Sequence, residues 1–294
     1  MDRRCVLAGF DGSPAAGQAV RWAAVEASRR GVPLRVCHAW NWPYPSRPED
    51  EAAAAIVRGM GAMVLDEGVR LARETAPDLD IAPLLRKGSA PGVLLEAGVK
   101  AELTVVGTRG SGGFDALPLG STATQVPAHA DRPVVVVPAG APHEERAGPA
   151  RIVVGVDGSP AGDAALRFAL GEARLHRAMV RVICAWWDPA VLPGPDRLPF
   201  TDPEKLKEHA KARFEAAITP CLAGYPEIAV ERRFVRERAQ RVLADNARGA
   251  SLLVVGDHGI GSSPRTLLGA VARAVLHEAP APIAIVPGQG PRTR

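Results

Sequence analysis

The chain has 294 residues, of which 47% are hydrophobic and 23% are charged, and its formal net charge is +4. This composition is typical of a globular protein and excludes a disordered chain, a collagen-like repeat and a disulfide-rich scaffold. The length predicts two domains, and no apolar run approaches the ~18 residues of a membrane-spanning helix.

The first apolar run is too short for a signal peptide and ends at Asp11, so we expect a cytoplasmic protein. The four cysteines show no C-x-x-C spacing, and buried free thiols are therefore expected in place of a metal or redox site. They are Cys5, Cys37, Cys184 and Cys221.

Apolar runs of four to six residues alternate with helical patterns through the first half of the chain. In chain order the pattern predicts a strand over 4–9, a helix over 14–30, a strand over 33–39, a loop over 40–48, a helix over 49–75, a strand over 80–85, a helix over 89–99, a strand over 102–106, a glycine-rich loop, a helix over 120–129 and a strand over 133–137. Short β-branched runs that alternate with helices predict a parallel sheet covered on both faces. Ser13-Pro14 is typical of a helix N-cap followed by proline at the first helical position.

The second half repeats the first in order and spacing. The segment 6–14 recurs as 152–160, and the segment 133–138 recurs as 282–287. We therefore predict an α/β protein of two tandem, doubly wound domains, each with a five-stranded parallel sheet. The first domain spans 1–139, a linker rich in Pro, Gly, Ala and Glu spans 140–150, and the second domain spans 151–294.

The loop after the predicted fourth strand is the best candidate for a binding site. Gly107 and Gly110 would let the backbone turn tightly and approach a ligand, and Gly120-Ser121 would open a helix. A helix N-terminus offers free N–H groups and a positive dipole end, which suit phosphate, and the hydroxyl of Ser121 adds a donor. The alternative is a plain glycine loop with Ser121 as a helix cap. The position favours a site, because doubly wound sheets bind ligands at the carboxyl ends of their strands.

The four residues match G-x2-G-x9-G-[S/T], the pattern of nucleotide-binding members of the universal stress protein family, which the chain resembles in its tandem form. The resemblance implies Rossmann-like domains that bind ATP, with Asp11 near the adenine and Ala39 in the base pocket. Asp11 could equally form only an Asx-turn with its own loop. Mg²⁺ would accompany ATP and be held mainly by its phosphates.

The second repeat keeps three of the four motif residues. Gly256, Gly259 and Gly269 are retained, but Ala270 replaces the hydroxyl residue and Asp257 adds a negative charge to the loop. Glu237 also replaces Gly88. A lost hydrogen bond to phosphate predicts weaker binding in the second repeat, where Asp157 and Ala185 occupy the positions of Asp11 and Ala39.

Three further features carry expectations. Pro127 should kink or shorten its helix.

The last strands, 134–137 and 283–286, are hydrophobic and should be edge or interface strands. The resemblance implies that these strands pack the two domains about a pseudo-two-fold axis. Tryptophans near the ends of the second strands could stack on a base, but a role in shielding the core is favoured. They are Trp40, Trp42, Trp186 and Trp187.

The sequence lacks the motifs of catalysis. It has no Walker loop, no G-x-S-x-G nucleophile elbow and no histidines at metal-ligand spacing, and Arg109 and Arg132 are candidates only for charge neutralisation. We predict a regulatory protein of the stress response that binds ATP, is not an enzyme and signals to a protein partner; a nucleotide-independent scaffold is the alternative. The arginines of 231–238 alternate with acids, as on a solvated face, so no nucleic-acid partner is expected. No membrane partner is expected either. A homodimer is possible.

Overall fold

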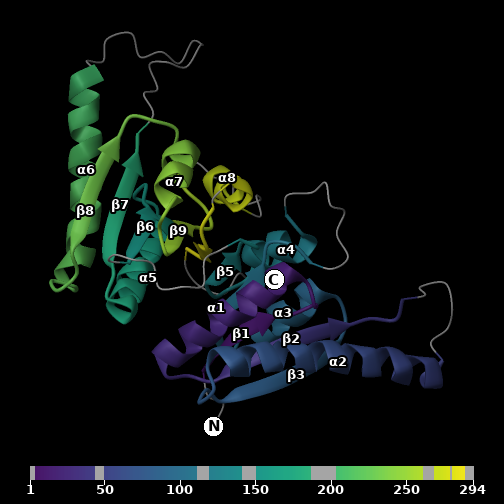
Figure 1. Ribbon diagram of the computed structural model, residues 1–294. Helices are drawn as coiled ribbons and strands as arrows, with labels where there is room; N and C mark the ends of the chain where they lie inside the picture. The colour runs from purple at the N-terminus through teal and green to yellow at the C-terminus, as the bar shows by residue number, and fades with distance from the viewer. Residues whose placement is uncertain are drawn as a thin grey trace, which may run out of the picture. The chain divides into compact units, whose positions relative to one another are not determined.

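A computed structural model describes residues 4–43, 50–110, 119–140, 150–186, 203–260, 268–278 and 280–288. The chain divides into two compact units, Met1–Glu145 and Arg146–Arg294 (Figure 1). The division falls inside the predicted linker 140–150, of which residues 141–149 lie outside the described ranges.

Unit one alternates strands and helices as predicted. Its elements are β1 (Cys5–Gly9), α1 (Pro14–Arg30), β2 (Leu34–Trp40), α2 (Glu51–Thr75), β3 (Ile81–Lys87), α3 (Ala90–Gly98), β4 (Ala101–Gly107), α4 (Ser121–His129) and β5 (Val134–Val137).

Unit two repeats this order. Its elements are β6 (Arg151–Gly155), α5 (Pro160–His176), β7 (Met179–Ala185), α6 (Pro203–Ala223), β8 (Val230–Val235), α7 (Ala239–Ala247), β9 (Leu252–Gly256), α8 (Ala270–Glu278) and β10 (Ile283–Val286).

The strands of each unit are parallel and follow the doubly wound order. In unit one the order is β3-β2-β1-β4-β5, and in unit two it is β8-β7-β6-β9-β10. The chain order reverses between β1 and β4, and between β6 and β9, which opens a crevice at the carboxyl ends of these strands. The α/β fold class predicted from the sequence is confirmed, whereas the pairing of the last strands about a pseudo-two-fold axis stays a prediction.

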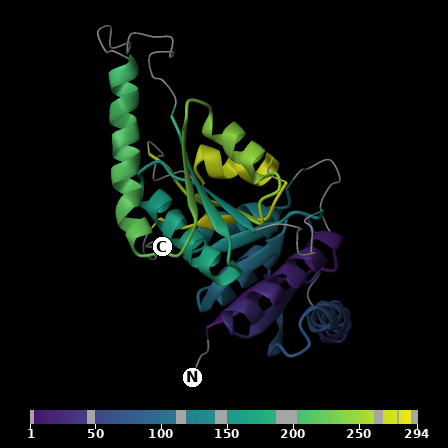
Figure 2. The ribbon, with the colours of Figure 1, turned by 60° about the vertical axis from the view of Figure 1, so that its left-hand side comes forward.

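Two layers of helices cover the first sheet. Helices α1 and α2 pack against each other on one face (Figure 2), and α3 packs with α4 on the other. The central strands are buried on both faces, and β5 has four valines that are all buried. Burial on both faces is why these strands are continuous apolar runs without alternation.

The helix starts follow from local sequence. The Oγ of Ser13 accepts a hydrogen bond from the amide of Ala16, and the Oγ of Ser159 accepts one from the amide of Gly162. Both caps precede a proline at the first helical position, as predicted. Each cap satisfies one of the N–H groups that a helix leaves unpaired at its start.

Pro127 does not shorten its helix, and the predicted kink stays a prediction. Helix α4 has nine residues, as does α8 at the equivalent place in unit two. Pro127 removes a single N–H near the end of the helix, and the amide of Ala130 still closes the last turn on the carbonyl of Val126 (3.0 Å). Among the helices in the described ranges, none combines the length and apolar character needed to cross a membrane.

Candidate functional site

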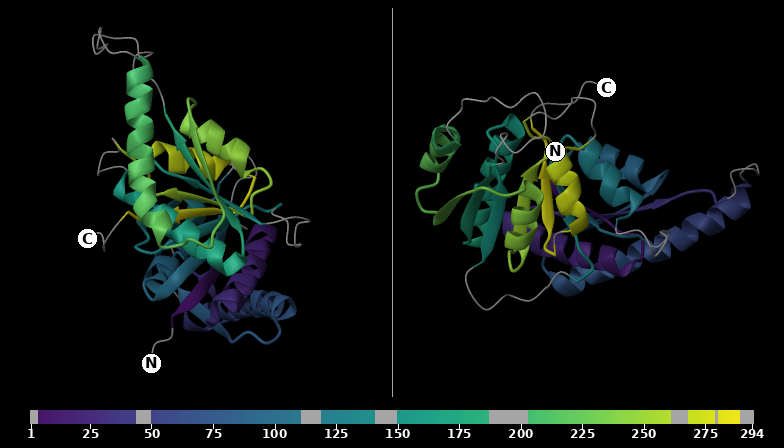
Figure 3. Two further views of the ribbon diagram at one scale, coloured as in Figure 1. Left: turned by 90° about the vertical axis from the view of Figure 1, so that its left-hand side faces the viewer. Right: turned by 90° about the horizontal axis from the view of Figure 1, so that it is seen from above.

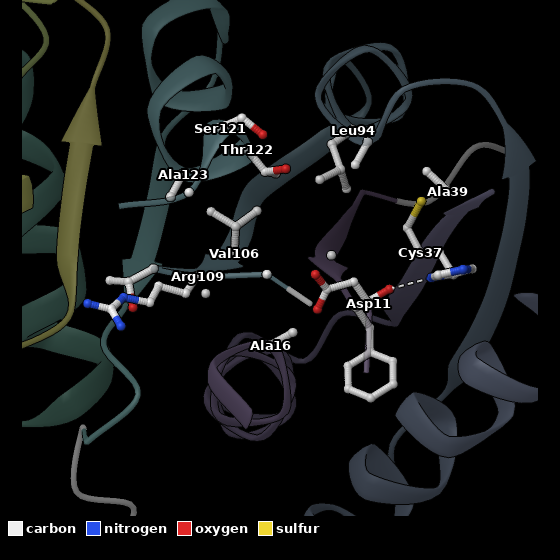
Figure 4. A pocket seen from close by; sticks show the side chains of 18 residues that line it. Asp11, Ala16, Cys37, Ala39, Leu94, Val106, Arg109, Ser121, Thr122 and Ala123 are labelled. Carbon is white, nitrogen blue, oxygen red and sulfur yellow. Dashed lines mark hydrogen bonds between the residues drawn. The ribbon is translucent and has the colours of Figure 1, made fainter. Parts of the chain in front are cut away.

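A cavity of about 240 Å³ lies at the strand-order reversal of unit one. The carboxyl ends of β1, β2 and β4 form its floor, and the first turn of α4 and a side of α3 form its walls. Figure 4 shows the hydroxyls of Ser121 and Thr122 and the carboxylate of Asp11 bordering the same space. The cavity therefore has an apolar part next to β2 and a polar part next to α4.

Asp11 both forms a turn and lines the cavity. Its Oδ1 accepts a hydrogen bond from the amide of Ser13 (3.0 Å), which is the Asx-turn considered from the sequence. The hydroxyl of Ser13 donates to the carbonyl of Arg109 (3.0 Å). The loop after β1 is thus tied to the loop after β4, and both loops line the cavity.

Packing within the protein accounts for two of the motif glycines. A Cβ at Gly107 would lie 2.6 Å from the backbone carbon of Ala15, and a Cβ at Gly110 would overlap the carboxylate of Asp11. The overlap at Gly107 cannot be relieved cheaply, because its partner is backbone in the first turn of α1. The overlap at Gly110 requires the carboxylate of Asp11 to shift, and its Oδ1 is bonded to the amide of Ser13. The glycines therefore allow the loop after β4 to lie against the loop after β1, whether or not a ligand binds.

The polar end of the cavity is the N-terminus of α4. The N-cap is Gly120, in an extended conformation and without a side-chain cap, and Ser121 is the first helical residue. The alternative of Ser121 as a helix cap is therefore wrong, and its hydroxyl is directed to the cavity side of the helix (Figure 4). An uncapped helix start with two hydroxyls beside it is an environment that favours an anion.

The opposite wall is apolar and comes from β2 and α3. Ala39, Cys37 and Leu94 line it. Burial raises the pKa of the Cys37 thiol to about 12, against the opposing effect of nearby arginines, so this thiol is neutral at physiological pH. His38 also lines the cavity, and its Nδ1 donates to the carbonyl of Phe10 (2.8 Å).

A second cavity of about 190 Å³ occupies the same place in unit two. The two cavities are similar in size but differ in their polar end. Ala270 and Val271 take the places of the two hydroxyl residues, and His258 takes the place of Arg109. The second cavity has therefore lost both side-chain donors next to the helix start.

The added acid of the second loop is turned away from this cavity. Asp257 is buried, and its Oδ1 accepts a hydrogen bond from the amide of Gly288 beyond β10 (3.1 Å). Its Oδ2 lies 3.2 Å from the Nδ1 of His258. Asp157 accepts hydrogen bonds from the amides of Ser159 (3.0 Å) and Ile260 (2.7 Å). Asp257 is thus not among the residues that line the second cavity.

The structure brings all the predicted site residues to the two cavities. In unit one these are Asp11, Ala39, Gly107, Gly110, Gly120 and Ser121; in unit two they are Asp157, Ala185, Gly256, Gly259 and Gly269. Arg109 lines the first cavity, but its guanidinium extends away from Asp11 (Figure 4). Arg132, Gly88 and Glu237 do not line either cavity.

Sequence reasoning missed Thr122, Leu94 and His38. Thr122 could have been found, because it follows Ser121 at the helix start, whereas Leu94 is part of an ordinary apolar helix pattern. The tryptophans in the described ranges stay outside the cavities. Trp186 stacks on Phe234 with ring centroids 6.3 Å apart, as expected for core shielding, and Trp187 lies outside the described residues.

Comparison with known proteins assigns the family. The universal stress protein family matches residues 3–138 and 149–287, which together span nearly the whole chain. The chain belongs to the universal stress protein family.

Relatives share the tandem arrangement of this universal stress protein over their full length. A universal stress protein of Mycolicibacterium smegmatis is 31% identical over 296 residues, which cover 96% of each chain. One of Mycobacterium tuberculosis is 30% identical over 289 residues, covering 95% of this chain and 96% of the relative. The crystal structure of a universal stress protein from Archaeoglobus fulgidus has a TM-score of 0.67 at 15% identity, covers 98% of this chain and 97% of that one, and supports the fold alone.

Proposed function

We propose that the cavity of unit one binds an adenine nucleotide, ATP together with Mg²⁺, and that the protein acts by holding the nucleotide. The base and ribose would lie against Ala39, Leu94 and Asp11, and the phosphates would meet the start of α4. Mg²⁺ would be held mainly by the phosphates.

The observation that carries this proposal is the polar end of the first cavity. Ser121 and Thr122 present their hydroxyls beside a helix start that no side chain caps. Free N–H groups, a positive dipole end and two hydroxyl donors together suit a phosphate group. This end lies opposite the apolar wall, which supports a ligand with an apolar ring at one end and phosphates at the other.

The cavity of unit two would bind the same nucleotide more weakly. It keeps the helix start but lacks both hydroxyls, because Ala270 and Val271 replace them. We infer one strong site and one weak site per chain.

Binding without turnover is favoured by the residues that line the first cavity. The described lining residues include no lysine and no glutamate. His38, the imidazole among them, already uses its Nδ1 on the carbonyl of Phe10. The bound state would then be passed to a protein partner in a regulatory role in the stress response.

The experiment that tests the proposal compares nucleotides on the purified, nucleotide-stripped protein. We expect ATP with Mg²⁺ to raise the unfolding temperature, GTP to raise it less, and the ATP to be recovered without stoichiometric hydrolysis. A folded protein that responds to none of these nucleotides would favour the alternative, a scaffold that works without nucleotide.

A further inference from the structure

The N-terminal half of α2 carries an apolar face that is open to solvent. Ile56, Met60 and Met63 are 67%, 63% and 74% exposed. Their spacing of four and then three residues places them on one side of the helix. Single exposed apolar residues are ordinary, but three large ones on one face form a patch, which marks an interaction surface.

Few residues in the N-terminal part of α2 pack against the rest of their own unit. Between Glu51 and Met60 only Ala54 is buried, whereas the other buried residues of α2 lie from Gly61 onward. Figure 3 shows the N-terminal end of α2 at the periphery of the unit. A short helical segment gains most of its stability from packing of one face, so an uncovered apolar face here calls for a partner.

The same spacing continues into a charged second half. The next positions of the series are Glu67, Arg70 and Glu74, and all three are about half exposed. Arg70 forms ion pairs with both glutamates, at 2.5 Å for Glu67. These bonds raise the pKa of Arg70 and lower that of Glu67. One helix face is therefore apolar up to Met63 and fully charged beyond it.

The second repeat shows that the fold does not need an apolar face here. Helices α2 and α6 precede the equivalent strands β3 and β8, whose first residues are 149 positions apart. The same offset pairs Leu65 with Phe214 and Val69 with Ile218, and all four are buried. The two helices therefore pack on their sheets in the same register.

The exposed face is where the two helices differ. Lys205, Glu208 and His209 stand at the positions of Ile56, Gly59 and Met60, and all three are exposed. The second repeat thus has a solvated helix, which is the usual solution for an outer face. At the described positions of the two helices, the apolar face occurs in α2 and not in α6, so the fold does not require it.

A row of small residues runs beside the large ones. Ala52, Ala55 and Gly59 are exposed and follow the helical spacing of the same face. A Cβ at Gly59 would meet nothing within 4 Å, so no packing inside the unit requires glycine there. Glycine is also among the poorest helix formers. A small row beside a large row is the shape that lets another helix approach closely.

We propose that this face is a dimer interface, in which α2 of one molecule packs antiparallel against α2 of a second molecule of the same chain. We expect a second copy of the chain as the partner because the helix face is apolar up to Met63 and charged from Glu67 onward. An antiparallel overlap of residues 52–63 sets apolar against apolar and leaves both charged halves, from Glu67 onward, in water at opposite ends. The overlapping stretch carries no charge along its face, so two copies do not repel each other there. The contact is short, about 18 Å for 12 residues at 1.5 Å per residue, and its small area predicts a weak, reversible dimer.

The test is analytical ultracentrifugation of the full chain over concentrations from nanomolar to high micromolar. We expect a reversible monomer–dimer equilibrium. The double variant Ile56→Lys, Met60→His installs the residues of the second repeat and should weaken dimerisation at least ~100-fold. The matched control is Lys205→Glu on α6, which should leave the equilibrium unchanged. Neither variant touches a cavity, so both should titrate with nucleotide like the parent.

Two further measurements keep the test independent of a folding defect. Gly59→Glu should abolish the dimer and yet raise the unfolding temperature of the monomer, because glutamate is the better helix former. Hydrogen exchange of the parent chain should slow over residues 52–63 as concentration rises, with no change over 205–213 of α6. A chain that stays monomeric at every concentration, or a dimer that survives both variants, overturns the proposal.

Discussion

Ala270 of the second cavity occupies the position of Ser121 in the first. Replacing Ser121 with alanine therefore removes from the first cavity a hydroxyl that the second cavity lacks. A hydrogen bond to a charged group contributes about 1.5–3 kcal/mol. Ser121 is exposed at the helix start, so the lower end applies. About 1.4 kcal/mol corresponds to a factor of ten in Kd, and we expect S121A to bind Mg-ATP about 10-fold more weakly. Adding Thr122→Val should bring the loss to about 100-fold if the two hydroxyls act independently.

The assay is calorimetric titration at fixed salt and Mg²⁺, with Thr124→Ala as the matched control. Thr124 is on the same helix, but its hydroxyl donates to the carbonyl of Gly120 (3.0 Å) and it does not line the cavity. Its variant should bind within about twofold of the parent, which is within the spread of neutral surface substitutions. An affinity that is unchanged in both S121A and the double variant would refute the assignment of the phosphates to the start of α4.

Three further outcomes are expected. Gly107→Ala should lower the free energy of unfolding in urea by about 1–3 kcal/mol, because the added Cβ meets the backbone of α1. The control Gly171→Ala should not destabilise the protein, because its Cβ meets nothing within 4 Å. Equal effects of the two substitutions would contradict the close packing at Gly107. Ser13→Ala should cost about 1 kcal/mol for the lost cap and weaken nucleotide binding, since it also frees the carbonyl of Arg109; intact binding would show that the tie between the loops is dispensable. Burial raises the pKa of Cys37 in the folded protein to about 12, whereas the pKa of a cysteine in the unfolded chain is near 8.5. The free energy of unfolding therefore has its full contribution from the neutral thiol below about pH 8.5 and loses it as the pH rises through about 12. Iodoacetamide at pH 8 should therefore spare Cys37 until urea is added, and rapid labelling of the native protein, seen by peptide mass spectrometry, would contradict this.

The repeat and the alternation of apolar runs predicted the fold almost to the residue. The helix expected over 14–30 is α1 with the same bounds, and the strand expected over 33–39 is β2, Leu34–Trp40. Two physical constraints acted together here: Ser13-Pro14 determines a helix start, and burial on both faces makes a strand an apolar run. The same segments occur twice, so each prediction had an internal check.

The sequence did not predict which contacts explain the motif glycines or where the carboxylate of Asp257 points. Gly107 and Gly110 suggested close approach to a ligand, yet both are required by contacts with the first turn of α1 and with Asp11. Asp257 suggested a charge facing phosphate, yet its carboxylate bonds the amide of Gly288. In each case the deciding partner is far away in the sequence, and the pattern of one segment cannot indicate it. A Cβ at Gly256 would meet Ala161 and a Cβ at Gly259 would meet Asp157, so the retention of these two glycines in the second repeat follows from packing and gives no measure of nucleotide affinity.

The most direct test of the account is the stoichiometry of Mg-ATP binding to the nucleotide-stripped full chain, measured by calorimetry. The account predicts one strong site per chain, with any second event much weaker and unaffected by S121A. Two sites of equal affinity would show that the hydroxyls of α4 do not distinguish the cavities, and no binding by a folded protein would contradict the proposed function itself.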